Sequence, residues 1–206
     1  NLDRSIKGFL NQSDEYLNKI YHREEDINNV SHAITDYLVK SNQLSLPLAD
    51  QKILGSMFYV VNDIERIGDH AENFADYTKT ELKHNTGLTG DAKEEIKKMY
   101  EAVSKLLKLS LESFMAQDGV NTQEDKLAEI AALEASIDKM ERRYQKHHIK
   151  RLAKGDCEPR AGLLFSDMLS ELERIADHSV NIAYSMSDED EDEMLAAENE
   201  ALATNN

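Results

Sequence analysis

Apolar residues recur at intervals of three to four positions along most of the chain, and short polar or glycine-containing stretches separate the periodic segments. That spacing is the pattern of amphipathic α-helices, which bury one face and leave the other in water. Capping residues and prolines mark where helices begin, as at Ser45-Leu46-Pro47. The pattern predicts an all-α protein with six helices, at about residues 2–12, 13–41, 45–82, 91–116, 121–155 and 156–186.

The chain contains an internal repeat, which is the strongest sequence guide to its architecture. Residues 62–73 return at 170–181, 108 positions later, with Glu, Arg, Ile, Asp, His and Asn in register. Residues 6–13 resemble residues 111–118 at an offset of 105, so the first helix matches only the end of the fourth. We therefore expect the first helix to be truncated, with a longer parent chain upstream. The alternative is a naturally short first helix.

The repeat divides the chain into two tandem three-helix-bundle repeats, residues 1–83 and 84–187, followed by a tail at 188–206. Long helices joined by short loops pack as antiparallel neighbours. The tail holds eight acidic residues and no basic one, which is half of the formal net charge of −16. Such a run is typical of a solvated, disordered segment, and a tail that binds a metal or a partner is the alternative.

The third and sixth predicted helices carry the clearest burial pattern. In each, four residues share one face, and we expect both faces to meet the core. These residues are Ile64, Ile67, Ala71 and Phe74 in the first repeat, and Leu172, Ile175, Ser179 and Ile182 in the second.

Acidic residues line the opposite side of the same two helices. In each repeat two acids and an asparagine, four positions apart, fall within an arc of about 80°: Glu65, Asp69 and Asn73, then Glu173, Asp177 and Asn181. Acids at positions i and i+4 repel each other, so their occurrence in both repeats favours a bound cation. Carboxylate and amide oxygens suit Mg, Mn and Fe-type ions. An ordinary solvated face is the alternative.

A second helix of each repeat offers further oxygen ligands. Glu134 and Asp138 lie four positions apart on the fifth helix, and Glu25 and Asn29 are the best match to them on the second helix. A metal ion clamped between two helices would use both the pair on this helix and the acids of the next one.

Each repeat also carries an arginine and a histidine four positions apart, namely Arg66 and His70, then Arg174 and His178. We expect the arginines to bridge acids of a neighbouring helix and the histidines to lie at a seam between helices. The alternative for the histidines is metal ligation, because imidazole binds many transition ions.

No arrangement typical of catalysis is visible in the sequence. Glu81 and His84 have the Glu-x-x-His spacing of di-iron bundles, but this motif occurs once and at a helix end. The chain shows no Ser-His-Asp or Cys-His grouping, glycine-rich phosphate loop or paired-cysteine site. We therefore expect a protein that is not an enzyme. A metal-dependent oxidase or iron-storage bundle is the competing hypothesis.

Composition limits the partners and the compartment. The acidic balance disfavours free nucleic acid as a partner, and no stretch approaches the ~18 apolar residues of a membrane span. Cys157 is the only cysteine, so we expect a reducing, cytoplasmic compartment. Cations at the end of the fifth helix suit the helix dipole, and contact with anionic lipid headgroups or an acidic partner is the alternative. They are Arg142, Arg143, Lys146, Lys150, Arg151 and Lys154.

At residues 65–73 and 173–181 the sequence resembles the PhoU family of bacterial phosphate-regulation proteins, and the resemblance extends to about Ser187. It implies two three-helix repeats, each with a Glu/Asp-x-x-x-Asp motif that can hold metal clusters on the bundle surface. Asn29 is an amide where the motif has an acid. The implied ions are Fe, Mn, Mg, Zn or Ni, without distinction among them. The implied metal ligands are Glu65, Asp69, Glu173, Asp177, Glu134, Asp138 and Glu25.

Within this family, residues 60–65 and 151–157 look more like the PhoU-like C-terminal domain of bacterial Na/phosphate cotransporter-related membrane proteins. The resemblance implies a regulatory domain on the cytoplasmic face of the inner membrane, with a sodium-dependent phosphate transporter upstream in the same polypeptide. The alternative is a free-standing adaptor that represses a phosphate sensor kinase and contacts an ABC phosphate transporter. Phosphate-signalling proteins and a second copy of the chain are further expected partners.

Overall fold

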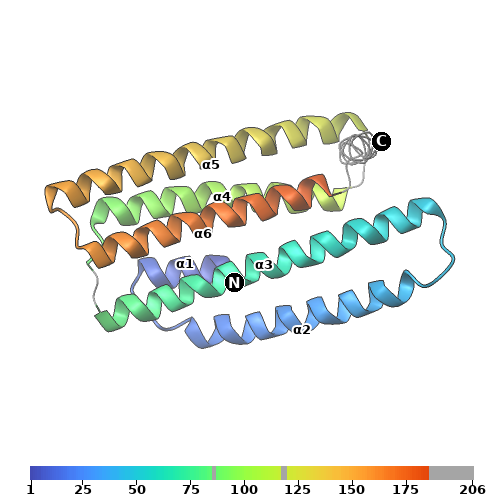
Figure 1. Cartoon of the computed structure of the whole chain (residues 1–206), viewed down its shortest axis with the longest axis horizontal. Helices are drawn as coiled ribbons and strands as arrows, with labels where there is room; N and C mark the ends of the chain where they lie inside the picture. The colour runs from blue at the N-terminus through green and yellow to red at the C-terminus, as the bar shows by residue number, and fades with distance from the viewer. Residues whose placement is uncertain (85–86, 117–119, 186–206) are drawn as a thin grey trace, which may run out of the picture.

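The computed structural model describes residues 1–84, 87–116 and 120–185, and within these ranges every regular element is a helix. The predicted acidic tail at 188–206 lies outside the described residues. The prediction of an all-α protein is confirmed, and the helix boundaries agree with the expected ones to within about four residues. The helices are α1 (Leu2–Leu10), α2 (Leu17–Ser41), α3 (Leu48–His84), α4 (Gly90–Ala116), α5 (Val120–Lys154) and α6 (Pro159–Tyr184) (Figure 1).

The larger boundary difference is at the start of α2, which begins at Leu17 and not at the expected residue 13 or 14. Gln12 has a positive φ of 50°, which turns the chain away from the axis of α1. The Ser13 side chain accepts a hydrogen bond from the Glu15 backbone N–H at 3.3 Å. Ser13 therefore stabilises a turn between two helices and does not cap α2.

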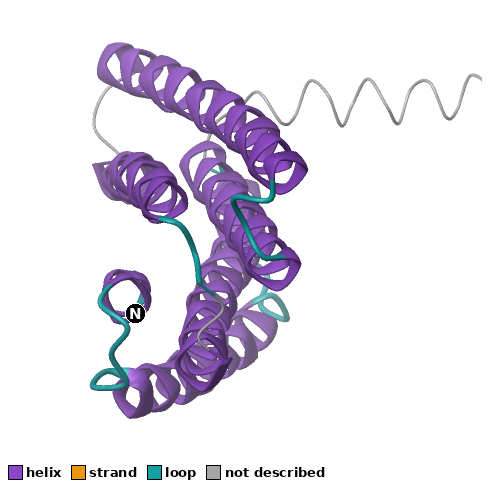
Figure 2. Cartoon of the chain, turned by 90° about the vertical axis from the view of Figure 1, so that its left-hand side faces the viewer, coloured by secondary structure: helices purple, strands orange, loops and turns teal. Residues whose placement is uncertain are grey.

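The six helices form two stacked units. Helices α1 to α3 make the lower unit in Figure 1, α4 to α6 make the upper one, and the two meet along α3 and α6. Figure 2, turned by 90°, shows the same helices from one end of the molecule. The expected pair of three-helix repeats is thus present, and the two repeated segments lie against each other at the centre of the molecule.

The main core runs through the interior of the second unit and continues to α1 and α3 of the first, and a smaller cluster joins α2 to α3. The main core is built mainly from aliphatic side chains with a few aromatic rings, including Phe9, Phe74 and Phe165. All four predicted core residues of α6 are buried, and the Ser179 hydroxyl donates to the Ile175 carbonyl oxygen at 2.6 Å. In α3 the prediction fails at one position, because Ile64 is 40 % exposed. The preceding residue, Asp63, is buried instead, because the α3 surface there faces His178 of α6.

The two units differ in their first helix. Helix α1 has 9 residues and its counterpart α4 has 27. In Figure 1, α1 lies beside only part of α3, and the far part of the α2–α3 hairpin extends beyond it. The largest exposed apolar side chains of that hairpin lie in this far part and include Val30, Tyr37, Leu44, Leu48 and Tyr59. Across the described residues, no helix combines the length and apolar character that crossing a bilayer requires.

Candidate functional site

The seam between α3 and α6 joins the two copies of the repeated segment by a reciprocal pair of contacts. His70 of α3 contacts Glu171 of α6, with 2.5 Å between Nδ1 and Oε2. His178 of α6 contacts Asp63 of α3, with 2.8 Å between Nδ1 and Oδ1. Each histidine stands 108 positions from the other, as do the two acids, so the contacts are related by the internal repeat. The two imidazole rings stack with their centroids 5.5 Å apart.

Further polar side chains complete the seam. The Asn73 amide and the Tyr77 hydroxyl both donate to the Glu171 carboxylate, at 3.1 and 3.2 Å. Burial alone would raise the pKa of Glu171, but the hydrogen bonds from His70 and Asn73 hold that pKa below its usual value. The seam position predicted for both histidines is therefore confirmed, and their role there is to pair with acids across the interface.

The arginine prediction is wrong for the first repeat. Arg66 was expected to bridge acids of a neighbouring helix, but its guanidinium lies 3.5 Å from Asp69 on its own helix. The contact is three positions along the same helix, on a surface where Arg66 is more than half exposed. It contributes little to the joining of helices, because exposed pairs of this kind are worth less than about 1 kcal/mol.

The first acidic cluster lies between α2 and α3. Glu24 of α2 is 2 % exposed, and it faces Gly68 of α3 so closely that a Cβ built there would lie 2.6 Å from its Oε1. Burial, with repulsion from Asp69 and other acids of α3, raises the pKa of Glu24 to about 7. The Asn1 amide donates to its Oε2 at 3.4 Å, and its Oε1 has no hydrogen-bond partner. Glu65 also faces Glu24 from α3.

The structure places Glu25 outside this cluster. Its side chain is 76 % exposed and lies 4.0 Å from His22 on the outer surface of α2. Glu24 takes the position that spacing assigned to Glu25, so the predicted register is off by one residue. The signal that would have found it is the buried periodicity of α2, because Leu17, Ile20 and Glu24 follow one another at helical spacing.

The second acidic cluster lies between α5 and α6, where the structure brings together the four acids predicted from the second repeat. Glu134 and Asp138 of α5 face Glu173 and Asp177 of α6. Burial and then mutual repulsion raise the pKa values of Glu134, Glu173 and Asp177. Glu141 of α5, which the sequence reading missed, belongs to the same cluster, and burial and Asp138 raise its pKa too.

Positive charge compensates these clusters only at their edges. Arg142 pairs with Asp138 at 3.1 Å, but its side chain is 72 % exposed. Both clusters offer only oxygen donors, which suit hard or borderline cations. Within the described residues, no three His, Cys, Asp or Glu side chains converge closely enough to form a metal centre. The clusters thus match a cation in the type of donor but not in the convergence of three donors, and Oε1 of Glu24 is left without a hydrogen-bond partner.

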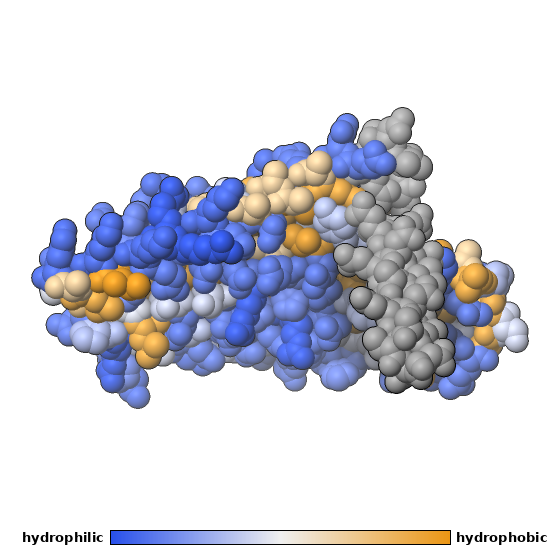
Figure 3. All heavy atoms as spheres, turned by 45° about the horizontal axis from the view of Figure 1, so that its top comes forward, coloured by the Kyte–Doolittle hydropathy of each residue, from blue (hydrophilic) through white to orange (hydrophobic). Residues whose placement is uncertain are grey.

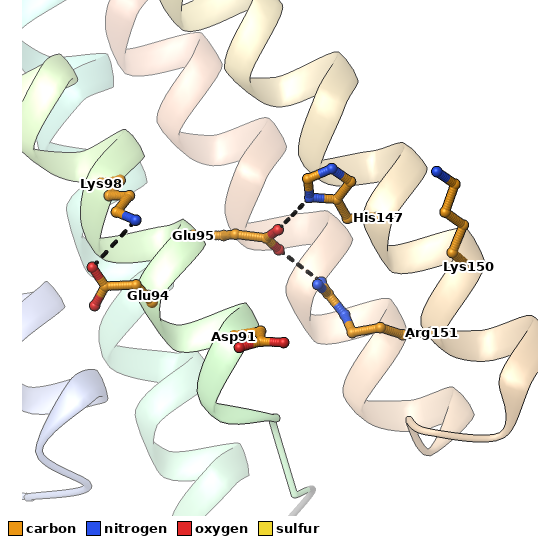
Figure 4. Close-up of a pocket in the computed structure, with 7 residues that line it drawn as sticks. All are labelled: Asp91, Glu94, Glu95, Lys98, His147, Lys150 and Arg151. Carbon is orange, nitrogen blue, oxygen red and sulfur yellow. Dashed lines mark hydrogen bonds and ion pairs between the residues drawn. The ribbon is translucent and has the colours of Figure 1, made fainter.

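A separate groove of about 370 Å³ lies between the start of α4 and the end of α5 (Figure 4). At its centre Glu95 accepts from Arg151 at 2.8 Å and lies 2.6 Å from His147. Figure 4 shows these three side chains pointing toward one another, while Lys150 stands apart on the outer side of α5. The Glu95 and Arg151 side chains are 12 % and 13 % exposed, so this ion pair mainly ties α4 to α5.

Comparison with known proteins identifies the family of this chain. The PhoU domain matches residues 1–78 and 96–186, which include both acidic clusters and the histidine seam. The chain therefore belongs to the PhoU domain family. Among curated proteins it is similar to the phosphate-specific transport system accessory protein PhoU homolog 1 of Thermotoga maritima, with 24 % identity over 136 residues. That match covers 63 % of this chain, which spans about half (56 %) of the length of the relative.

Solved structures support the fold. The chain is similar to PhoU from Pseudomonas aeruginosa, with a TM-score of 0.79 and 22 % identity over 89 % of this chain and 85 % of that one. It is also similar to the phosphate transport system regulatory protein PhoU from Streptococcus pneumoniae, with a TM-score of 0.76 and 22 % identity over 90 % and 86 % of the two chains. At this identity the likeness shows the shared bundle architecture.

Proposed function

We propose that this chain is a regulator of phosphate transport that acts through contacts of its helix faces and catalyses no reaction. The observation that carries the proposal is the match of the PhoU domain to both repeats, including the acids and histidines that they share. The names of its relatives, an accessory protein and a regulatory protein of phosphate transport systems, support the same role. A stacked pair of helical units suits an adaptor, because it offers long exposed faces to partner proteins.

The free-standing form of this regulator receives more support than the form tethered to a transporter. The relatives that match the chain are named as PhoU proteins or PhoU homologues of phosphate transport systems, and none of these names describes a sodium-coupled transporter. The expected partners are therefore proteins of a phosphate transport system in the cytoplasm. An antibody against this chain tests the point in cell extracts. A small soluble species supports the free-standing form, and a much larger species confined to membranes supports the tethered form.

We also propose that the two acidic clusters bind metal ions of the Fe, Mn, Mg, Zn or Ni class. Glu65, Asp69 and Glu24 would hold the ion in the first unit, and the acids around Asp138 and Asp177 would hold it in the second. A cation supplies positive charge that relieves the repulsion within each cluster. It would thereby strengthen the α2–α3 and α5–α6 hairpins and change the charge that the protein presents to its partners.

Elemental analysis of purified protein after metal loading tests this second proposal. Variants Glu65→Gln/Asp69→Asn and Glu173→Gln/Asp177→Asn should each lose metal from one unit. The matched control is Glu25→Gln/Asp26→Asn, which removes the same charge from exposed positions of α2. Equal metal content in all four proteins would reject the clusters as metal sites.

The regulatory proposal is tested by removing the chain from its cell and measuring phosphate uptake under scarce and abundant external phosphate. We expect uptake without the chain to lose its normal response to phosphate supply, because the transport system is then unregulated. An unchanged response in the deletion strain would overturn the proposed function.

A further inference from the structure

We propose that the C-terminal half of α5 is a docking face for anionic lipid, which holds this protein against a membrane surface by charge. Residues 139–154 contain seven basic residues and one acid, a net charge of +6. Because the whole chain carries −16, all other residues together carry −22. The protein is therefore strongly acidic with one concentrated basic segment, and an anionic surface would attract it through that segment alone.

The cations of this segment lie on one side of the helix. At 100° per residue, six of them fall within an arc of about 120°, and all six are exposed. From first to last they span 16 residues, or about 22 Å of helix. We call this set the basic stripe; it consists of Lys139, Arg142, Arg143, Lys146, Lys150 and Lys154.

Most of the stripe's charge is not neutralised within the protein. Across the described residues, Lys139, Lys146, Lys150 and Lys154 make no ion pair, whereas lysines elsewhere, such as Lys105 with Glu129, pair with acids. Arg151 is excluded from the stripe, because its guanidinium is turned inward to Glu95. Figure 4 shows the contrast, with Arg151 directed toward α4 and Lys150 directed away from it. The stripe is thus available to an external anion.

The helix dipole accounts for only part of this pattern. A dipole favours cations within the last turn of a helix, and it explains Arg151 and Lys154 at the end of α5. Lys139, Arg142 and Arg143 lie three or more turns earlier, where that effect has faded. Arg142 also pairs with Asp138 on the same helix, but neither the dipole nor an ion pair within the protein accounts for the exposed Lys139.

The shape and composition of the stripe favour lipid headgroups over an acidic protein. Its unpaired charges are mostly lysines, which act as point charges without the fixed geometry of arginine and are depleted in protein–protein interfaces. The groove beside it has Lys150 of the stripe at its edge, but it is also lined by three acids of α4, and its central Glu95 is already paired with Arg151, so it offers an anion no pocket of positive charge. Figure 3, with α5 turned toward the viewer, shows hydrophilic side chains spread over this part of the helix. A layer of mobile anionic headgroups fits such a surface.

Exposed apolar residues lie at the same end of the molecule. Ile149 is 62 % exposed beside the basic stripe, and Leu163, in the first turns of α6 just across the α5–α6 connection, is 66 % exposed. Apolar side chains next to a basic face add burial in the interfacial region to the electrostatic attraction. No helix needs to cross the bilayer for this mode of binding.

Vesicle co-sedimentation of the full chain tests the proposal. The vesicles are phosphatidylcholine alone, or phosphatidylcholine with about a third phosphatidylglycerol, each at low and high NaCl. We expect binding only to the vesicles that contain phosphatidylglycerol, weakened by salt because the exposed charges are screened. The variant Lys139→Gln/Lys146→Gln/Lys150→Gln/Lys154→Gln should bind at least tenfold more weakly, since each lysine near the surface contributes to partitioning.

The matched control is Lys19→Gln/Lys40→Gln/Lys83→Gln/Lys97→Gln, which makes the same change of charge at exposed positions off the stripe. It should bind like the unaltered chain. Failure to bind the anionic vesicles, or equal binding by the stripe variant and the control, would overturn the proposal. Retention on a polyglutamate resin without any vesicle binding would also overturn it, and would assign the stripe to an acidic polypeptide. None of these outcomes depends on the proposed regulatory function.

Discussion

His70 and Glu171 are 101 positions apart in the chain, yet their side chains lie 2.5 Å apart at the centre of the molecule. The internal repeat generates the matching contact between His178 and Asp63. The two acids are not equivalent, because Glu171 contacts three side chains and Asp63 two. The histidine contact of Asp63 is 2.8 Å against 2.5 Å, and its asparagine contact is 3.5 Å against 3.1 Å. The two acids thus occupy equivalent positions in the repeat, but Glu171 is held by more contacts than Asp63.

Removing the stronger acid should therefore destabilise the protein more. We expect Glu171→Ala to lower the free energy of unfolding by about 2–4 kcal/mol, because it leaves the buried His70 and the half-buried Asn73 and Tyr77 without their shared partner. Asp63→Ala should cost less, about 1–3 kcal/mol. Chemical denaturation measures both, with Asp167→Ala on the exposed side of α6 as the control. Equal losses for all three variants would contradict the role of the seam.

Glycine substitutions test how closely the helices approach each other. A Cβ at Gly162 would lie 2.4 Å from the His148 ring, which is buried and cannot move far, so Gly162→Ala should cost about 1–3 kcal/mol. At Gly68 the obstacle is the end of the flexible Glu24 side chain, so Gly68→Ala should cost less.

The control for both glycine variants is Gly55→Ala. It adds a methyl group inside α3 where nothing lies within 4 Å, and it should stabilise the protein by up to about 1 kcal/mol through helix propensity. Thermal melting of the three variants gives their order. A destabilised Gly55→Ala variant, or a neutral Gly162→Ala variant, would show that the contacts at these crossings are not as described.

The pH dependence of stability follows from Glu24. Its pKa is about 7 in the folded protein against an ordinary value of 4.5, so the folded state holds a proton that the unfolded state has lost between these values. Stability from this group is therefore highest below pH 4.5, falls as the pH rises from 4.5 to about 7, and stays at its low value at higher pH. In buffer with a chelator, Glu24→Gln should raise the free energy of unfolding by about 1–3 kcal/mol at pH 8. It should change little near pH 4.5.

The matched control for this prediction is Glu25→Gln, because Glu25 is the neighbouring exposed acid of α2. It should leave the stability unchanged at both pH values. A Glu24→Gln variant that tracks the Glu25→Gln variant at pH 8 would mean that the Glu24 carboxylate is ionised without cost in the folded protein.

Much of this organisation could be predicted from the sequence. The helices follow from local periodicity, which acts over short distances along one helix. The two units and the meeting of Glu134, Asp138, Glu173 and Asp177 follow from the repeat, which shows that the two halves share one arrangement. What periodicity cannot supply is the rotation of a helix about its own axis relative to its neighbours. Polar contacts between helices decide that rotation, and they turned the predicted core position Ile64 toward solvent.

The same limit explains why Glu25 lies outside the first acidic cluster. Glu25 and Asn29 were matched to Glu134 and Asp138 by spacing along the chain, but the packing of α2 on α3 turns Glu24 inward. Gly68 makes that packing possible, because its missing side chain leaves room for the Glu24 carboxylate. The sequence feature that points to Glu24 is its place at helical spacing after the buried Leu17 and Ile20, together with a glycine within the facing helix.

We propose that regulation of phosphate transport by this chain depends on the two acidic clusters. The most direct test is phosphate uptake in a strain that lacks the chain and is supplied with Glu65→Gln/Asp69→Asn/Glu173→Gln/Asp177→Asn. We predict that this variant folds, by circular dichroism, but fails to restore the response of uptake to external phosphate, whereas the unaltered chain and Glu25→Gln/Asp26→Asn restore it. Full restoration by the four-residue variant would contradict the claim.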